Sequence, residues 1–176
     1  MTKLSRASLL GAGSAVALVG LPLMSRFVEA AVRLDADDID SLNAQIELER
    51  AGVKAYRDAQ ATGLLAPPVM EVAGRFASDH AAHLDALNAA VTAGGGRPST
   101  ATASLVYPHL ASQKDILEFA LSVEREAAVT YLSVVSDLKN RKLAELVASI
   151  LGVETTHVSM LASALGQVAY ASAFVA

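Results

Sequence analysis

Apolar residues recur every three or four positions along four stretches of the chain, the spacing that places side chains on one face of an α-helix. The stretches cover approximately residues 36–61, 67–93, 112–138 and 141–165. Residues that favour helix ends bound them. Pro67 and Pro68 suit a first helical turn, Ser112 with Asp115 resembles a capping box, and the run 94–96 is all Gly and stops a helix. The pattern therefore predicts four helices.

The lengths of the connections predict how these helices are arranged. Only residues 62–66 join the first pair and 139–140 the second, so each pair is expected to form an antiparallel hairpin. Residues 97–111 show no helical spacing and are numerous enough to run the length of a bundle. We therefore expect an all-α fold over residues 36–165, an antiparallel four-helix bundle of two helical hairpins joined by a long crossover. Residues 166–176 form an apolar C-terminal tail with no predicted element.

Polar residues interrupt the apolar stripe of each predicted helix, and they do so twice in a similar pattern. The first copy is Glu49, Tyr56, His80 and His83, and the second, about 75 positions later, is Glu124, Tyr131, Glu154 and His157. In each copy the Glu precedes the Tyr by seven positions, and the last two residues are three positions apart. These spacings return to one face of a helix. Two such halves facing each other would bring carboxylate and imidazole groups into one buried cluster.

Three carboxylates of this cluster, those of Glu49, Glu124 and Glu154, fall on apolar stripes. A bare carboxylate buried among apolar residues costs on the order of several kcal/mol or becomes neutral, and a bound cation offsets that cost. The cluster is therefore predicted to bind metal. The alternative is a metal-free bundle in which internal hydrogen bonds satisfy the same groups. A lone His-x-x-His or Glu-x-x-His pair would favour that alternative, whereas both pairs together with two Glu–Tyr pairs favour a metal.

The spacing of these residues resembles the ferritin-like superfamily of di-iron carboxylate proteins, in its rubrerythrin-like and exported bacterial branch. The resemblance covers residues 36–165 and rests on Glu49–x6–Tyr56, Glu124–x6–Tyr131 and Glu154–x–x–His157. The family places a terminal Glu on one helix of each pair and a Glu-x-x-His on the other. The resemblance implies that Glu49 and Glu124 are terminal or chelating ligands and that Glu154 bridges two metals. It implies that His83 and His157 each bind one metal ion. Tyr56 and Tyr131 would lie just outside the ligands as hydrogen-bond or redox partners, the catalytic residues of such a site.

One position departs from this pattern, because His80 stands where the second helix of the family carries its bridging Glu. An imidazole that ligates through one nitrogen cannot bridge two metals, and the six ligands then carry −3 rather than −4 against the +4 of two divalent ions. Three arrangements follow: His80 is a terminal ligand of a two-metal site with one bridge, the site holds a single metal, or the neighbouring Asp79 replaces His80 through a local helix distortion. Imidazole suits Zn, Cu and Ni as well as iron. The cofactor is predicted to be di-iron, with Mn or Zn as alternatives.

Residues 1–30 have the features of an export signal: a basic start with Lys3 and Arg6, then an apolar run. The start resembles a twin-arginine motif except that Ala7 stands where the second Arg is required, which leaves general secretion or an uncleaved membrane anchor open. We expect a cleaved signal and a periplasmic or extracellular protein. Removing this segment, with three basic residues and one acidic residue, would change the net charge from −4 to −6. An acidic protein without Lys/Arg clusters argues against nucleic acid as a partner.

The resemblance also implies a chemistry, because sites of this family oxidise ferrous iron with O2 or peroxide, reduce peroxide or store iron inside cages. The chain has no Cys, so a peroxidase reaction would need an external electron donor instead of an in-chain rubredoxin module. We expect an exported di-iron protein with ferroxidase, oxidase or peroxide-detoxifying activity, whose partners are metal ions and O2 or peroxide. The alternative is a non-enzymatic bundle that binds Zn or a single metal ion for structure, sequestration or stress protection. A homo-oligomer is compatible with either.

Overall fold

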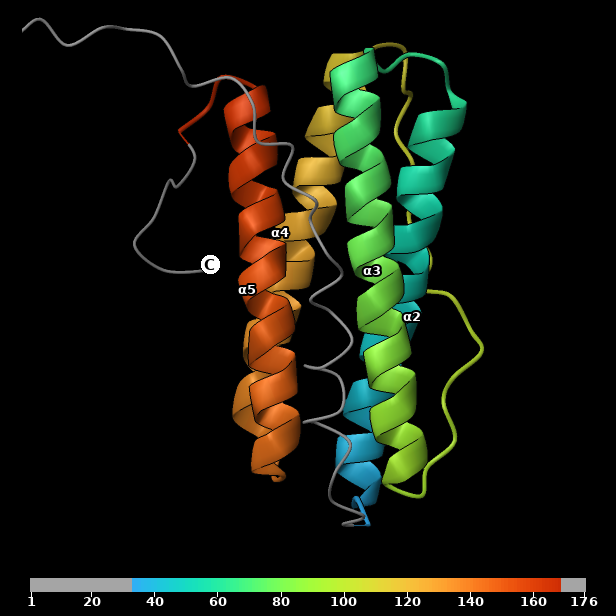
Figure 1. Cartoon of the computed structure of the whole chain (residues 1–176), viewed down its shortest axis with the longest axis vertical. Helices are drawn as coiled ribbons and strands as arrows, with labels where there is room; N and C mark the ends of the chain where they lie inside the picture. Colours follow the sequence, from blue (N-terminus) through green and yellow to red (C-terminus); the bar gives the residue numbers. More distant parts are fainter. Residues whose placement is uncertain (1–32, 169–176) are drawn as a thin grey trace, which may run out of the picture.

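The computed structural model describes residues 33–168, and these residues form four α-helices in the predicted order (Figure 1). The helices are α2 (Ala36–Ala61), α3 (Pro67–Ala93), α4 (Gln113–Asp137) and α5 (Arg141–Ala164). Each helix begins and ends within one residue of the predicted stretch. The predicted all-α fold is therefore confirmed.

The local sequence explains where the helices begin. The Asp35 side chain accepts a hydrogen bond from the Asp38 N–H (3.0 Å) at the start of α2. At the start of α4, the Ser112 hydroxyl accepts from the Asp115 N–H (3.2 Å) and donates to the Asp115 carboxylate (2.8 Å). Such caps each stabilise a helix by about 0.5–2 kcal/mol. Helix α3 begins with Pro67 and Pro68, which have no N–H groups, so two of the donors that a helix start leaves unpaired are absent here.

The helices form two antiparallel hairpins that pack side by side. Helix α2 packs along α3, and α4 packs along α5 (Figure 1). The crossover, residues 97–111, is hydrogen-bonded to α2. The Arg50 guanidinium donates to the carbonyl oxygens of Ala101 and Ser99 (2.9 Å each), and the Ser99 hydroxyl donates to the Glu47 carboxylate (2.7 Å). The crossover is thus fixed to the first hairpin.

Two apolar clusters fill the bundle and leave a polar layer between them. One cluster includes Leu42, Ile46, Leu87, Val91, Leu146, Val147 and Ile150. The other includes Ala59, Phe76, Leu117, Leu121, Leu161 and Ala162. Each large aliphatic side chain that becomes fully buried stabilises the fold by about 1.5–3 kcal/mol. On every helix the predicted ligands lie between the residues of the two clusters, so apolar side chains enclose the polar layer from both ends.

Helix α5 has the length and apolar composition that a membrane-spanning helix requires. One face of this helix, which includes Leu146, Ile150 and Leu161, is buried against the rest of the bundle. The core helix of a helical bundle can have the same composition, so this feature carries no membrane assignment.

Two predicted segments fall on residues that the structure does not describe. The predicted export signal, residues 1–30, lies outside the described residues, so export and cleavage stay predictions. Residues 169–176 of the predicted tail lie outside them as well. At the start of the tail, Gly166 has φ of 70° and the Gln167 N–H donates to the Ala162 carbonyl (2.9 Å), which is a common way to end a helix.

Candidate metal centre

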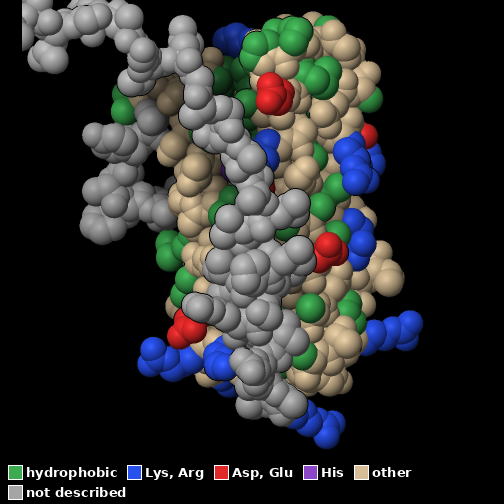
Figure 2. All heavy atoms as spheres, viewed as in Figure 1, with side chains coloured by type: hydrophobic (Ala, Val, Ile, Leu, Met, Phe, Trp, Pro, Cys, Tyr) green, Lys and Arg blue, Asp and Glu red, His purple; other side chains and the backbone are tan. Residues whose placement is uncertain are grey.

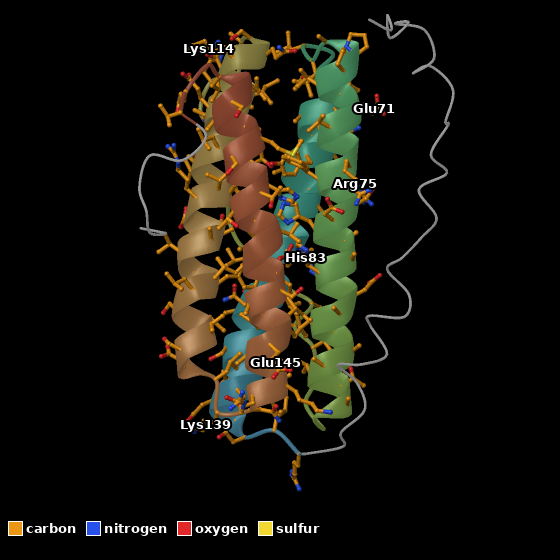
Figure 3. All side chains as sticks on the ribbon, turned by 60° about the vertical axis from the view of Figure 1, so that its left-hand side comes forward. Glu71, Arg75, His83, Lys114, Lys139 and Glu145 are labelled. Atoms are coloured by element: carbon orange, nitrogen blue, oxygen red, sulfur yellow. The ribbon has the colours of Figure 1, made fainter. Side chains whose placement is uncertain are left out.

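The six predicted ligands lie at one level of the bundle. Helix α2 contributes Glu49, α3 contributes His80 and His83, α4 contributes Glu124, and α5 contributes Glu154 and His157. All except His83 are at most 3% exposed, and the His83 side chain is 11% exposed. Figure 3 shows the labelled His83 at mid-height of the bundle, between α3 and α5. In the space-filling view, which has the orientation of Figure 1, almost no histidine is visible among the described residues (Figure 2).

One group of four possible ligands consists of Glu49, His80, His83 and Glu154. One potential ligand atom from each of them lies within 4.8 Å of the others. The His80 Nδ1 is 2.7 Å from Glu49 Oε2, and the His83 Nδ1 is 3.0 Å from Glu154 Oε1 and 3.4 Å from Glu49 Oε1. This group therefore joins ligands from α2, α3 and α5.

A second group consists of His80, Glu124, Glu154 and His157, with one potential ligand atom from each again within 4.8 Å of the others. The His80 Nε2 is 3.2 Å from Glu124 Oε1. The His157 Nδ1 is 3.4 Å from Glu124 Oε2 and 3.5 Å from Glu154 Oε2. The two groups thus share His80 and Glu154, and each has one Glu and one His of its own.

Several potential ligand atoms of the cluster lie close to each other but have no hydrogen-bond partner. The atoms without a hydrogen-bond partner are His83 Nδ1, His157 Nδ1, Glu124 Oε2 and both carboxylate oxygens of Glu154. A buried polar atom without a partner costs about 1–3 kcal/mol. Because these atoms converge, and because carboxylate oxygens and imidazole nitrogens are metal ligands, divalent cations fit the cluster and would satisfy all of them.

The two tyrosines connect the hairpins at the same level. The Tyr56 hydroxyl on α2 donates to Glu124 on α4, and the Tyr131 hydroxyl on α4 donates to Glu49 on α2. Burial, followed by the neighbouring carboxylates, raises the pKa of both hydroxyl groups well above its ordinary value. Both tyrosines therefore stay protonated and act as donors, which orients the carboxylate of the opposite hairpin.

The three buried carboxyl groups differ in their pKa. Burial opposes ionisation of each, but the histidines beside Glu49 outweigh it and hold the pKa of that carboxyl below its ordinary value. The histidines beside Glu124 hold its pKa well below the ordinary value in the same way. Burial, together with the nearby Glu124, keeps the pKa of Glu154 above its ordinary value. Glu154 is therefore the one of the three carboxyl groups whose surroundings oppose its ionisation.

The pKa values of the three imidazole rings are all raised. Burial lowers the pKa of each, but the carboxylates of the cluster outweigh it. They raise the pKa of His80 well above its ordinary value and those of His83 and His157 to about 9. Protonated rings would balance part of the charge of the carboxylates in the metal-free cluster. Metal ions that bind the same atoms would displace these protons.

The structure bears on whether Asp79 takes the place of His80. Asp79 points away from the cluster: its carboxylate accepts hydrogen bonds from the Arg75 guanidinium (3.1 Å) and lies 3.4 Å from the His157 Nε2. The ring of His80 itself lies between the two groups. Of the three arrangements, this geometry directs the His80 ring, rather than the Asp79 carboxylate, towards both groups. Asp79 instead faces the outer nitrogen of His157, so that the Nδ1 atom of this ring faces the cluster.

Two further residues of the polar layer were missed from the sequence. Gly52 lies against the His80 ring, where an added Cβ would be 2.9 Å from Nδ1. A Gly on the buried side of a helix, three positions after a candidate ligand, was the available signal. Gln45 is 1% exposed, and its Oε1 has no hydrogen-bond partner. It precedes Glu49 by one helical turn, and its uncharged side chain is not a typical metal ligand, so the sequence carries no signal for it.

A pocket of about 500 Å³ reaches the cluster from the surface between α2, α4 and the crossover. Its walls include Leu48, Gly52, Leu105, Pro108, Phe119, Val123 and Ala127. The buried Glu49, His80 and Tyr131 also line it, whereas Val106 and Glu126 lie at its exposed rim. A small molecule can therefore approach the first ligand group through a largely apolar passage.

Comparisons with known proteins agree with this fold. A model of the ferritin-like domain family matches residues 37–167. No curated protein matches the chain at a significant level. A ferritin-like di-iron-carboxylate protein from Bacillus anthracis str. Ames has a TM-score of 0.64 and 23% identity, over 73% of this chain and 95% of that one.

Two other solved structures show the same fold at low identity. Bacterioferritin from Rhodobacter capsulatus, solved with a metal-free dinuclear site, has a TM-score of 0.69 and 20% identity, over 75% of this chain and 85% of that one. A conserved hypothetical protein from Mycobacterium tuberculosis has a TM-score of 0.66 and 20% identity, over 78% of this chain and 96% of that one. Because the family match covers most of the chain, including the four helices and all six clustered residues, the chain belongs to the ferritin-like domain family.

Proposed function

We propose that this protein binds two divalent metal ions, with iron as the physiological metal, and uses them in oxidase, ferroxidase or peroxide-detoxifying chemistry. The observation that carries the proposal is the set of buried ligand atoms without hydrogen bonds, arranged in two groups that share His80 and Glu154. Internal hydrogen bonds satisfy only the other polar atoms of the cluster, whereas two cations would also satisfy the atoms of this set.

The residues of the centre have separate roles in this proposal. Glu49 with His83, and Glu124 with His157, would be the separate ligands of the two ions, and Glu154 would contact both. The tyrosine hydroxyl groups keep the two terminal carboxylates oriented across the hairpins. When bound, iron supplies the electrons that reduce O2 or peroxide. Because the chain has no Cys, repeated turnover with peroxide requires an electron donor from outside the chain.

The pocket between α2 and α4 favours a reactive centre over a purely structural one. Structural metal sites are usually closed, whereas catalytic sites keep a position open to a small molecule. Here Glu49 and His80 line a pocket that reaches the surface. O2 and peroxide are small enough to pass through it, and its apolar walls limit the entry of water.

The test begins with the metal content of the purified chain, measured by elemental analysis. The chain is then loaded with ferrous iron without oxygen and exposed to O2, while absorbance and O2 consumption are recorded. We expect about two irons per chain and O2 consumption that depends on them. Glu154→Gln should lower iron occupancy, whereas His109→Ala, in the exposed part of the crossover, should not.

A zinc-binding, non-enzymatic role is the second candidate, and the two imidazole rings in each ligand group favour it. A stable, colourless zinc-loaded protein that consumes no O2 after iron loading would establish this role in place of the oxidative one. A chain that retains no metal of either kind after careful purification would overturn both.

We also propose that the protein is exported, on the basis of the signal-like residues 1–30. N-terminal sequencing of the protein recovered from the periplasm or medium tests this: cleavage near residue 30 supports export, and an intact N-terminus in the cytoplasm contradicts it. A homo-oligomer is a further proposal, prompted by the fold that the chain shares with the Rhodobacter capsulatus bacterioferritin, and size-exclusion chromatography with light scattering would test it.

A further inference from the structure

We infer that His80 bridges the two metal ions through its two ring nitrogens. The inference rests on the proposed metal-binding function and adds to it how the two ions are connected. The His80 Nδ1 belongs to the first ligand group, 2.7 Å from Glu49 Oε2, and its Nε2 belongs to the second, 3.2 Å from Glu124 Oε1. A ring that directs one nitrogen into each group can be a ligand of both ions. A ring that ligates through a single nitrogen can be a ligand of only one.

Glu154 connects the same two groups in the same way. Its Oε1 is 3.0 Å from the His83 Nδ1, and its Oε2 is 3.5 Å from the His157 Nδ1. Neither oxygen has a hydrogen-bond partner. The centre is therefore built with two shared residues, one imidazole from α3 and one carboxylate from α5. Each ion would receive two nitrogens and two carboxylate groups, a ligand set that suits Cu²⁺ and Zn²⁺ as well as iron.

The surroundings of His80 hold its ring in this orientation. The Tyr56 ring is stacked on it with the ring centroids 5.5 Å apart and an angle of 24° between the planes. On the α2 side, Gly52 leaves room for the ring, since a Cβ at that position would be about 3 Å from three of the ring atoms. The ring is therefore confined by α2 in the plane that directs its two nitrogens to different groups.

A bridging ring would also change the charge of the centre. Three carboxylates give −3, which leaves an excess of +1 when two divalent ions are bound. A bridging ring would release its remaining N–H proton to solvent as the second ion binds. It then carries −1, so that the ligands together carry −4 against +4. The bridging His80 thus supplies the charge of the fourth carboxylate that the family pattern carries at this position.

Loading of the full chain with Cu²⁺ tests the bridge by a signal that does not depend on activity. Two Cu²⁺ ions joined by an imidazole ring are coupled, so the electron paramagnetic resonance spectrum should show a half-field transition. The integrated intensity of the whole spectrum should fall below that of two spins per chain on cooling. Two bound ions with the spectrum of isolated Cu²⁺ would overturn the bridge but keep the metal-binding function. One ion per chain would also overturn the bridge, and no bound ion would overturn the proposed function itself.

Three variants distinguish the contribution of His80 to the coupling from that of Glu154 and from that of an exposed histidine. In His80→Ala the coupling should be lost while at least one ion stays bound, and coupling that persists would assign the bridge to Glu154 alone. In His80→Glu a carboxylate would bridge, so two ions should bind with a coupling different from that of the natural chain. Since His80→Glu follows the family pattern, it also serves if His80→Ala does not fold. His109→Ala is the matched control, because His109 is exposed on the crossover, and it should keep both ions and their coupling.

Discussion

The contact between Gly52 and the His80 ring can be tested by adding a single methyl group. In Gly52→Ala the new Cβ would lie 2.9 Å from Nδ1 and 3.0 Å from both Cε1 and Cγ of the ring. The ring cannot move away freely, because it is buried and its nitrogens face Glu49 and Glu124 on either side. Gly152 on α5 offers the matched control, since an added Cβ there would meet no atom within 4 Å.

The magnitudes follow from two opposing effects. Replacing Gly by Ala inside a helix stabilises it by about 0.8–1 kcal/mol, and this gain applies at both positions. Overpacking of a buried contact costs about 1–3 kcal/mol, and this cost applies only at Gly52. We therefore expect Gly152→Ala to be stabilised by up to about 1 kcal/mol. Gly52→Ala should be less stable than Gly152→Ala by about 1–3 kcal/mol.

Urea unfolding of the metal-free protein, followed by circular dichroism, measures both free energies of unfolding. Metal occupancy of the two variants, measured by elemental analysis after loading with Zn²⁺, reports the effect on the centre. We expect Gly52→Ala to bind less metal than the natural chain and Gly152→Ala to bind the same amount. If Gly52→Ala is as stable as Gly152→Ala and binds as much metal, the ring is not confined by α2 and the reasoning fails.

Three further predictions concern residues around the cluster. Tyr131→Phe keeps the ring but removes the hydrogen bond to the Glu49 carboxylate; it should destabilise the metal-free protein by about 1.5–3 kcal/mol in urea unfolding, and an unchanged midpoint would contradict this role. Asp79→Asn removes the negative charge facing the outer nitrogen of His157; it should weaken Zn²⁺ affinity by roughly 10- to 100-fold in a chelator competition, and unchanged affinity would show that Asp79 does not orient the ring. In the metal-free protein the pKa values of His83 and His157 are raised from the ordinary value of 6.5 to about 9. Protonation of these two residues therefore stabilises the fold fully below pH 6.5, and this stabilisation is lost as the pH rises through 9. The urea midpoint should therefore fall from pH 6 to pH 8 and again to pH 10. Equal midpoints at the three pH values would contradict the raised pKa values of the two histidines.

The fold was predictable from the sequence because its signals are local. Each helix is bounded by residues that act within one turn, such as Pro67 or Ser112, and each presents an apolar stripe. The depth of the candidate ligands was predictable for the same reason, since spacings of three, four and seven fix which face a residue occupies. The meeting of Glu49, Glu124 and Glu154 at one level followed from placing two repeated hairpins face to face.

Other properties of the centre depend on contacts between helices, which spacing does not encode. The two nitrogens of His80 face different groups because of how α3 is rotated against α2 and α4. The closeness of Gly52 to this ring depends on the same packing. Asp79 is adjacent to His80 in the chain, yet its partner is His157 on the other hairpin. These relations required the structure.

The crossed tyrosine pairs have a consequence for how the centre assembles. Each hairpin supplies the hydroxyl group that holds a carboxylate of the other hairpin, and each ligand group contains residues from both hairpins. Neither hairpin can therefore complete a metal site alone. Under the proposed function, the free energy of metal binding would add to the free energy with which the two hairpins associate, by about 2.7 kcal/mol when the free metal is at 100 times its dissociation constant. With the proposed metal binding, metal supply would set how tightly the two halves of the protein are held together.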